Sequence, residues 1–242
     1  IADGSLREGC SADDRLRWAM FGAETFRPLA LELIGASTVA ECRQAMALLG
    51  GVAFDHDASP LLRLHAAWIL ARGGRPEQAA GMFRAAIEPV LAEPTQEPTE
   101  FAWAGPTDAE RCCGFALRHL ADALGDAALP LLQVSMRSKS WCWHIDLLEG
   151  LLAVGPSAVP ALRAVLADVE AEEVARNRAI LVLHALGDAS AVPELLAVVQ
   201  EGNVQLANAA TDAAFEMGGA DTRAQLFDLL RACGCRRRPE SA

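Results

Sequence analysis

The sequence contains no tyrosine, and aromatic residues make up only 5% of its 242 positions. Apolar residues nevertheless reach 52%, so a hydrophobic core must be built mainly from Ala, Leu and Val. Ala and Leu are strong helix formers, whereas strands are enriched in β-branched and aromatic residues. The composition therefore predicts closely spaced helices and disfavours a fold based on sheets.

Positive charge is also scarce, because 21 Lys and Arg stand against 32 Asp and Glu and give a formal net charge of −11. Nucleic acids attract basic surfaces, so this balance disfavours a nucleic-acid partner. One basic cluster, Arg236 to Arg238, follows the last helical pattern, where three charges supply only weak nonspecific attraction. We expect a protein partner and no nucleic acid.

Long apolar runs and a disulfide framework are missing as well. The longest uncharged stretch, Gly150 to Leu162, is too short to span a bilayer and contains Gly155, Pro156 and Pro160, so we expect no membrane span. Seven cysteines, an odd number, are scattered along the chain and lie partly inside helical patterns. This usage favours reduced thiols, and we therefore expect a cytoplasmic protein.

Four glycines divide the second half of the chain into similar units. Gly125, Gly155, Gly187 and Gly218 are 30, 32 and 31 residues apart, and each follows an apolar pattern with helical spacing. Glycine readily adopts the left-handed conformation that ends a helix, and a proline in the first turn of the next helix loses no intrahelical hydrogen bond. The unit is predicted to be a helix, a tight turn and a second helix.

The first half of the chain repeats more loosely. A helix is expected to open at Ser59-Pro60 and to end at Gly73-Gly74, and Pro76 opens its partner. Earlier helices are expected near residues 12–26, 28–34 and 38–49.

A loop insertion is predicted at residues 93–107, which carry three prolines and one glycine. It contains Phe101 and Trp103, which either contact a partner or fold back over the neighbouring helices. With tails at residues 1–10 and 236–242, the sequence predicts one all-α domain over residues 1–242. Its architecture is expected to be an α-solenoid of about five antiparallel helix pairs.

One unit shows the repeat pattern most clearly, because residues 185–188 read Ala-Leu-Gly-Asp and residues 191–196 read Ala-Val-Pro-Glu-Leu-Leu. This pattern resembles the HEAT-like repeats first associated with phycobilisome lyases. The resemblance covers Asp108 to Cys233, with units shorter than the usual HEAT repeat. It implies an α-solenoid, a fold whose concave surface commonly binds proteins.

Enzymes with HEAT-like repeats would need features that this sequence lacks. Deoxyhypusine hydroxylases of this kind would require His-Glu dipeptides to hold a di-iron centre, and the sequence contains none. Alkylpurine DNA glycosylases would need a basic concave surface, which the acidic composition opposes. A relation to phycobilin lyases is supported by the repeat alone, and we expect no cofactor.

Superposition of the units on their glycines brings His119, Glu149, Leu181 and Asp212 to one helix position, with His184 in a neighbouring position one turn on. The His, Glu and Asp side chains could meet in one groove and bind a divalent metal or perform acid–base chemistry. The alternative, which we favour, is a polar groove lining with ordinary hydrogen bonds.

The run Trp141-Cys142-Trp143-His144 is the most unusual local sequence. Trp141 and Trp143 cannot share one helix face, so one ring could be exposed and serve with His144 as a binding anchor. The alternative is that Trp143 packs between repeats while Trp141 caps a helix end.

Polar groups in two successive repeats form a second candidate for partner binding. Arg176 and Asn177, with Asn208 one repeat later, could add positive charge and hydrogen-bonding groups to the groove. The alternative is a solvated helix start with salt bridges inside the repeat. The leading hypothesis is thus a protein-binding scaffold, adaptor, assembly factor or inhibitor that uses the concave face of the solenoid. The competing one is a lyase-like or metal-dependent enzyme with a polar site in the concave groove.

Leu183 should lie between helices, because it belongs to the apolar pattern formed with Ala179, Val182 and Leu186. Replacement of Leu183 by Ala is expected to lower the free energy of unfolding by about 2–5 kcal/mol through the transfer and cavity terms. Chemical denaturation measures this change. A loss below about 0.5 kcal/mol, as surface substitutions give, would show that the helix is rotated from the expected orientation.

Overall fold

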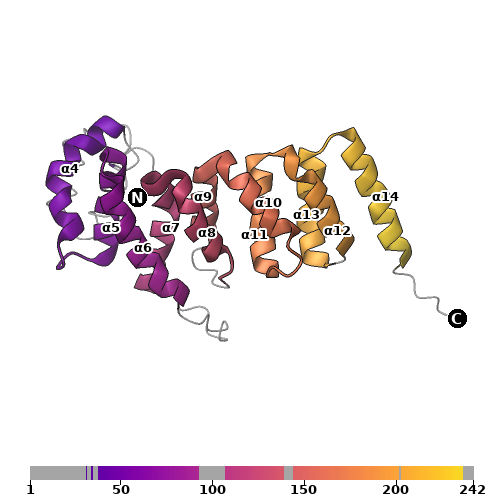
Figure 1. Ribbon diagram of the computed structural model, residues 1–242, viewed down its shortest axis with the longest axis horizontal. Helices are drawn as coiled ribbons and strands as arrows, with labels where there is room; N and C mark the ends of the chain where they lie inside the picture. Colours follow the sequence, from indigo (N-terminus) through magenta and orange to yellow (C-terminus); the bar gives the residue numbers. More distant parts are fainter. Residues whose placement is uncertain are drawn as a thin grey trace, which may run out of the picture. The chain divides into compact units, whose positions relative to one another are not determined.

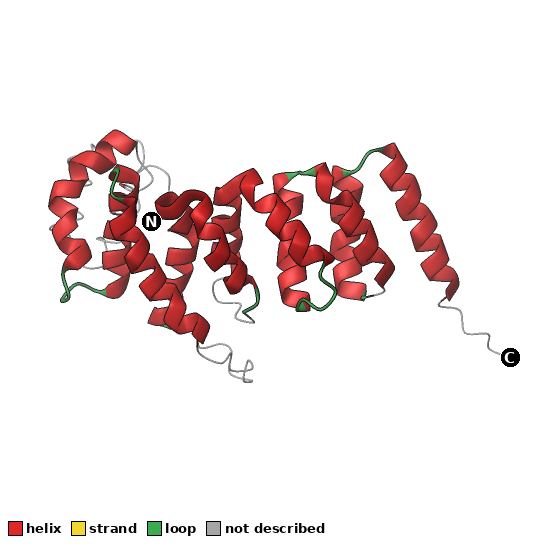
Figure 2. Cartoon of the chain, in the orientation of Figure 1, coloured by secondary structure: helices red, strands yellow, loops and turns green. Residues whose placement is uncertain are grey.

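The protein is all-helical in a computed structural model, and the described residues contain no strand (Figures 1 and 2). The structure describes Leu31, Ile34 and residues 38–92, 107–138, 144–201 and 203–236. The predicted all-α class is confirmed for these residues. They divide into two compact units, unit 1 with residues 1–128 and 140–150, and unit 2 with residues 129–139 and 151–242. The expectation of one continuous domain stays a prediction.

Unit 1 is built around helix α5. Its elements are α4 (Val39–Phe54), α5 (Pro60–Gly73), α6 (Pro76–Ala92), α7 (Asp108–Leu124), a 3₁₀ turn η2 (Gly125–Ala128) and the first part of α9 (His144–Val154). Helix α5 packs against α4, α6 and α7, and α6 also packs against α7. Ten of the fourteen residues of α5 are buried, so this helix forms the centre of the unit.

The boundaries of α5 and α6 follow the predicted signals. The Ser59 hydroxyl accepts a hydrogen bond from the backbone N–H of Leu62, and Gly74 ends α5 with a left-handed backbone at φ 109°. Pro76 is the first residue of α6. The predicted helix at 38–49 is also confirmed, although α4 extends to Phe54.

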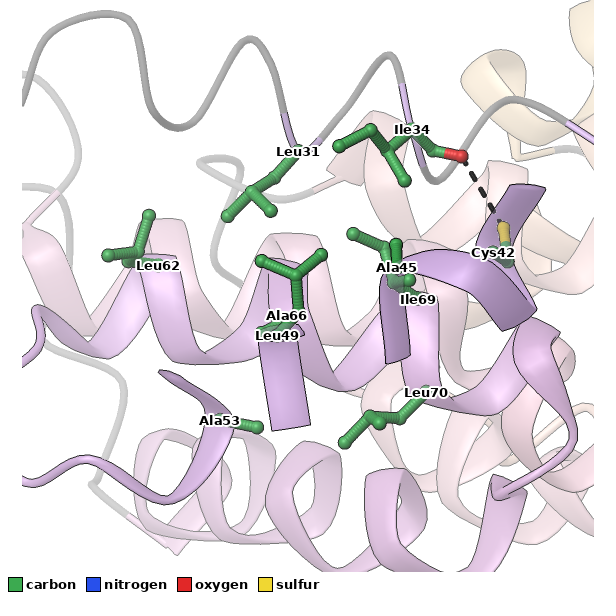
Figure 3. Packing of buried hydrophobic residues seen from close by; sticks show 10 residues of the cluster. All are labelled: Leu31, Ile34, Cys42, Ala45, Leu49, Ala53, Leu62, Ala66, Ile69 and Leu70. Carbon is green, nitrogen blue, oxygen red and sulfur yellow. Dashed lines mark hydrogen bonds between the residues drawn. The ribbon is translucent and has the colours of Figure 1, made fainter. Parts of the chain in front are cut away.

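A core of Leu, Ile and Ala side chains, with Cys42, joins α4 to α5 (Figure 3). Leu31, Ile34 and the α4 residues lie against α5; the buried side chains are Leu31, Ile34, Cys42, Ala45, Leu49, Ala53, Leu62, Ala66, Ile69 and Leu70. The Cys42 thiol donates a hydrogen bond to the carbonyl oxygen of Ile34 over 3.4 Å. Cys42, Cys112 and Cys113 are all buried and form no disulfide.

Unit 2 arranges its helices in two rows. Its elements are α8 (Leu129–Met136), the end of α9, the 3₁₀ turn η3 (Gly155–Ala158), α10 (Val159–Ala167), α11 (Glu173–Leu186), η4 (Ala189–Ala191), α12 (Val192–Glu201), α13 (Val204–Met217) and α14 (Ala220–Arg236). Helix α12 contacts α10 and α14, whereas α11 contacts α13 (Figure 1). Contacts of α10 with α11, and of α13 with both α12 and α14, join the rows. Leu183 is fully buried, as predicted.

The four repeat glycines do not share one backbone conformation. Gly125, Gly155 and Gly187 have positive φ angles of 54°, 72° and 67°. The predicted left-handed helical conformation is confirmed at Gly187, where ψ is 22°. It is wrong at Gly125, where ψ is −134°, and at Gly218, where φ is −85° and ψ is 156°. Glycine is required at position 218 for space, because a Cβ atom would lie 2.4 Å from Cγ2 of Thr222.

One stretch, His144–Ala167, is long and apolar enough to cross a membrane by length and composition, a test that core helices of soluble proteins also pass. The structure interrupts it with η3 and buries four of its leucines, Leu147, Leu151, Leu162 and Leu166. The expectation of no membrane span stays a prediction.

Replacement of Gly218 by Ala should lower the free energy of unfolding by about 1–3 kcal/mol, because the added methyl group overpacks the contact with Thr222. Gly219→Ala is the matched control, since a Cβ atom there meets nothing within 4 Å. Urea unfolding followed by circular dichroism measures both changes. Equal effects at the two positions would contradict the steric explanation.

Candidate functional site

Two arginines near the start of α11 are directed into the fold. Arg176 is only 5% exposed, and its guanidinium group donates to both carboxylate oxygens of Glu201, at 2.6 and 2.7 Å. The same group donates to the carbonyl oxygen of Leu166 at the end of α10. Arg176 therefore joins the ends of α10 and α12 to α11, and it is not an exposed group that a partner could contact.

Arg178 is fully buried. Its Nη1 donates to the carbonyl oxygens of Met136 and Ser138 at 2.8 and 2.6 Å, with a longer contact to that of Ser135. Burial lowers the pKa of this guanidinium to about 10, so it remains charged at neutral pH. The carbonyls at the end of a helix lack intrahelical partners, and Arg178 supplies donors for those of α8.

The sides of α11 and α13 that face away from their buried residues form an exposed surface. We call it the α11–α13 outer face and define it by Glu173, Asn177, Leu181, His184, Asn208, Asp212, Phe215 and Glu216. These residues lie on the sides of the two helices opposite the buried Ala179 and Ala210. Leu181 and Phe215 are 37% and 43% exposed, which gives this face two large apolar side chains on neighbouring helices.

Polar contacts link the outer face to itself and to α14. Nε2 of His184 lies 2.8 Å from the carboxylate of Glu216, which connects α11 to α13. The Arg223 guanidinium lies over the Phe215 ring at 4.7 Å, and its Nε donates to the Phe215 carbonyl oxygen. The cation therefore covers part of the ring and marks the edge of the face toward α14.

Unit 1 contains a cluster of stacked rings between α5 and α7. The imidazole of His119 lies 3.8 Å from the Trp68 ring between centroids, and Phe115 contacts both His119 and His65, at 4.6 and 4.1 Å. The indole N–H of Trp68 donates to Asp122 over 2.6 Å, and Nδ1 of His119 lies 3.3 Å from the same oxygen. Asp122 thus holds both rings in place.

The carboxyl group of Asp122 has a lowered pKa. Burial acts in the opposite direction and would raise it, but the hydrogen bonds from His119 and Trp68 favour the charged form. Charge interactions with His119 and Arg72 act in the same direction. The net result is a carboxylate that stays ionised and binds its donors over a wider pH range.

Arg118 connects α7 to α9 through two carboxylates. Its guanidinium lies 2.8 Å from Asp146 and 2.6 Å from Glu149. Burial raises the pKa of Asp146, and the Arg118 charge partly opposes this shift. Glu149, a candidate for a metal or catalytic role, is therefore paired with an arginine.

The other members of that candidate set have separate partners. His119 contacts Asp122, whereas His184 contacts Glu216 instead of Asp212, which is exposed on α13. Within the described ranges, no three His, Cys, Asp or Glu side chains are grouped so that they could hold a metal ion.

The candidates for partner binding have different locations. Asn208 is exposed and Asn177 half-buried on the α11–α13 outer face, and His144 is the half-buried first residue of α9. Trp141, Trp143, Phe101 and Trp103 lie outside the described residues, as does the predicted loop insertion except for Thr107.

Sequence reasoning did not select the apolar members of the outer face. The superposed repeats already place Leu181 in the same position as Asp212, and Phe215 in the same position as His184. The alignment was thus sufficient to locate both residues, but chemistry was sought only in the polar side chains. Exposure together with position on the packed helices α11 and α13 identifies the apolar pair, although Phe227 and Leu230 of α14 are more exposed. Large apolar side chains on a surface often mark a contact site.

Replacement of Asp122 by Asn should lower the free energy of unfolding at neutral pH by about 0.5–1 kcal/mol, because solvent weakens the lost charge-assisted hydrogen bonds. A lowered folded-state pKa stabilises the fold above the unfolded value of about 3.9, and this contribution disappears as the pH falls through the folded value. The difference from the wild type should therefore stay constant near neutral pH and shrink as the pH falls below about 5 and through the folded pKa of Asp122.

Urea unfolding at several pH values measures this difference, with Asp126→Asn on the exposed turn η2 as the control. A difference that does not change with pH would contradict a charged Asp122 as the source of the stabilisation.

No protein-family model matches the chain, and neither a curated protein nor a solved structure matches it. The resemblance to HEAT-like repeats therefore stays a prediction.

Proposed function

We propose that this protein is a protein-binding module, built as an α-solenoid of HEAT-like repeats, that acts as a scaffold, adaptor, assembly factor or inhibitor. The observation that carries this proposal is the exposure of Leu181 and Phe215 on the neighbouring helices α11 and α13. The rest of the proposal rests on the repeat pattern and on the polar surroundings of these two side chains.

The row arrangement of unit 2 supports the solenoid. In helical repeat proteins, each repeat contacts its neighbours, and equivalent helices of successive repeats lie side by side. Contacts between α10 and α12, between α12 and α14, and between α11 and α13 follow this rule. A regular stack presents the same helix position in every repeat, so the outer residues of successive helices form one continuous surface.

The composition of the α11–α13 outer face supports protein binding. A binding energy concentrated in a few large side chains, with polar groups around them, is typical of protein interfaces. Leu181 and Phe215 would be the large side chains, and the amides of Asn177 and Asn208 can both donate and accept hydrogen bonds around them.

The other residues that the sequence suggested for partner binding fall into two groups. Trp141, Trp143 and His144 remain proposed anchors, as do Phe101 and Trp103, on the sequence argument alone. Arg176 is not part of the proposed surface, because its guanidinium is buried against Glu201 and Leu166.

A lyase-like or metal-dependent enzyme is the second hypothesis from the sequence. In the part of the chain that the structure describes, His119, Glu149 and His184 are engaged by Asp122, Arg118 and Glu216. No observation favours the enzyme, and the binding function is the one we carry forward.

The proposal is tested with the double variant Leu181→Ser, Phe215→Ser, which removes both apolar side chains from the outer face. Truncation of interface anchors typically costs 2 kcal/mol or more, so partner capture from source-cell extract should fall at least roughly tenfold. Quantitative pull-down with mass spectrometry measures the loss. The control is Val169→Ser, because Val169 is 64% exposed in the connection between α10 and α11 and is not one of the residues that define the outer face.

Thermal unfolding must show that both variants are folded. Capture that is unchanged in the folded double variant would remove the α11–α13 outer face from the proposal. The same measurement on Trp141→Ala and Trp143→Ala then tests the second set of anchors, and unchanged capture in all of these variants would contradict the binding function at the proposed sites.

A further inference from the structure

The two cations of helix α11 are both directed away from its exposed side. Arg176 and Arg178 are the only Lys or Arg residues in α11, and they are 5% and 0% exposed. Their guanidinium groups bind Glu201 and the carbonyl oxygens at the ends of α10 and α8. Helix α13 contains no Lys or Arg at all. Because both arginines of α11 are buried in structural contacts and α13 has none, the outer sides of the two helices carry no Lys or Arg.

Three carboxylates remain on the α11–α13 outer face. Glu173, Asp212 and Glu216 are exposed there, on the same helix sides as Leu181 and Phe215. Glu216 contacts His184, but its side chain is still 67% exposed, and the imidazole is positive only when protonated. Arg223 lies at the edge of the face, where it is engaged by the ring and the carbonyl oxygen of Phe215.

This combination of carboxylates and apolar side chains favours a binding partner with positive charge. Carboxylates placed beside apolar side chains attract an approaching cation and repel another carboxylate, and like charges brought together at an interface are costly. The attraction reaches about 8–10 Å at moderate salt, which spans the distance between neighbouring helices. An acidic partner would meet the same face with no Lys or Arg from α11 or α13 to receive it.

We infer that the α11–α13 outer face binds a partner segment that carries Lys or Arg side chains next to apolar ones. The apolar side chains of that segment cover Leu181 and Phe215, and its cations pair with Asp212 and Glu216. This inference rests on the proposed binding function and specifies the chemistry of the partner.

Two fluorescently labelled peptides test the inference with the full chain. Each is an amphipathic peptide of about 18 residues, roughly five helical turns, with the same leucine pattern. One peptide carries Lys on its polar side and the other carries Glu. Fluorescence anisotropy at low and at physiological ionic strength measures their affinities. The wild type is expected to bind the Lys peptide at least roughly tenfold more tightly than the Glu peptide at low salt, with a smaller ratio at high salt.

Charge reversal locates the binding site. The variant Asp212→Lys, Glu216→Lys should lose at least roughly tenfold in affinity for the Lys peptide and gain affinity for the Glu peptide. Asp57→Lys, Glu88→Lys is the matched control, because it changes the net charge equally at two exposed positions of unit 1. It should reduce Lys-peptide affinity much less. Leu181→Ser, Phe215→Ser should weaken the Lys peptide without reversing the preference.

Several outcomes would overturn the inference. Equal affinity for both peptides would show that apolar contact alone decides binding, and an equal loss in both charge-reversal variants would show general attraction to an acidic chain. Failure of both peptides to bind, while the serine variant still loses its partner in the pull-down, would refute a cationic partner but leave the binding function intact. Failure of both peptides to bind, together with unchanged partner capture by the serine variant, would refute both the cationic partner and the binding function.

Discussion

The buried guanidinium groups of Arg176 and Arg178 are the contacts on which unit 2 depends most. The last carbonyls of a helix have no partner within the helix, and these two side chains supply donors to those of α10 and α8. Desolvation of a charge is costly, and the cost is offset only where hydrogen bonds are numerous. Both arginines meet that condition, so the ends of three neighbouring helices are fixed to α11, and the chemistry of its outer side follows.

In unit 1, the charged group that joins two helices is a carboxylate. Asp122 at the end of α7 receives the indole N–H of Trp68 from α5 and lies against His119 of its own helix. The rings stack on each other, so the polar contact and the aromatic contact fix the same pair of helices. In both units a charged group sets how two helices meet, while Ala and Leu fill the space between them.

The sequence was sufficient for features that depend on a few neighbouring residues. Ser59, Gly74 and Gly187 act through local hydrogen bonds and backbone angles, so their roles could be predicted. Gly218 has a different constraint that no turn pattern signals, because a Cβ atom there would meet the side chain of Thr222 and the backbone oxygen of Ala214. The sequence led us to expect Arg176 either in a polar groove or at a solvated helix start with salt bridges inside the repeat. Its burial depends on helix ends that meet only in three dimensions, and the same holds for the exposure of Leu181 and Phe215.

The uneven distribution of aromatic residues has a spectroscopic consequence. No tryptophan lies within the segments of unit 2, residues 129–139 and 151–242, and the chain has no tyrosine. Among the described residues, intrinsic fluorescence therefore comes from Trp68 of unit 1, which is sensitive to the imidazole stacked on it. Unit 2 contributes to the far-ultraviolet circular dichroism but gives no tryptophan emission. The two signals together reveal, without any label, whether the units unfold in one cooperative step or in two.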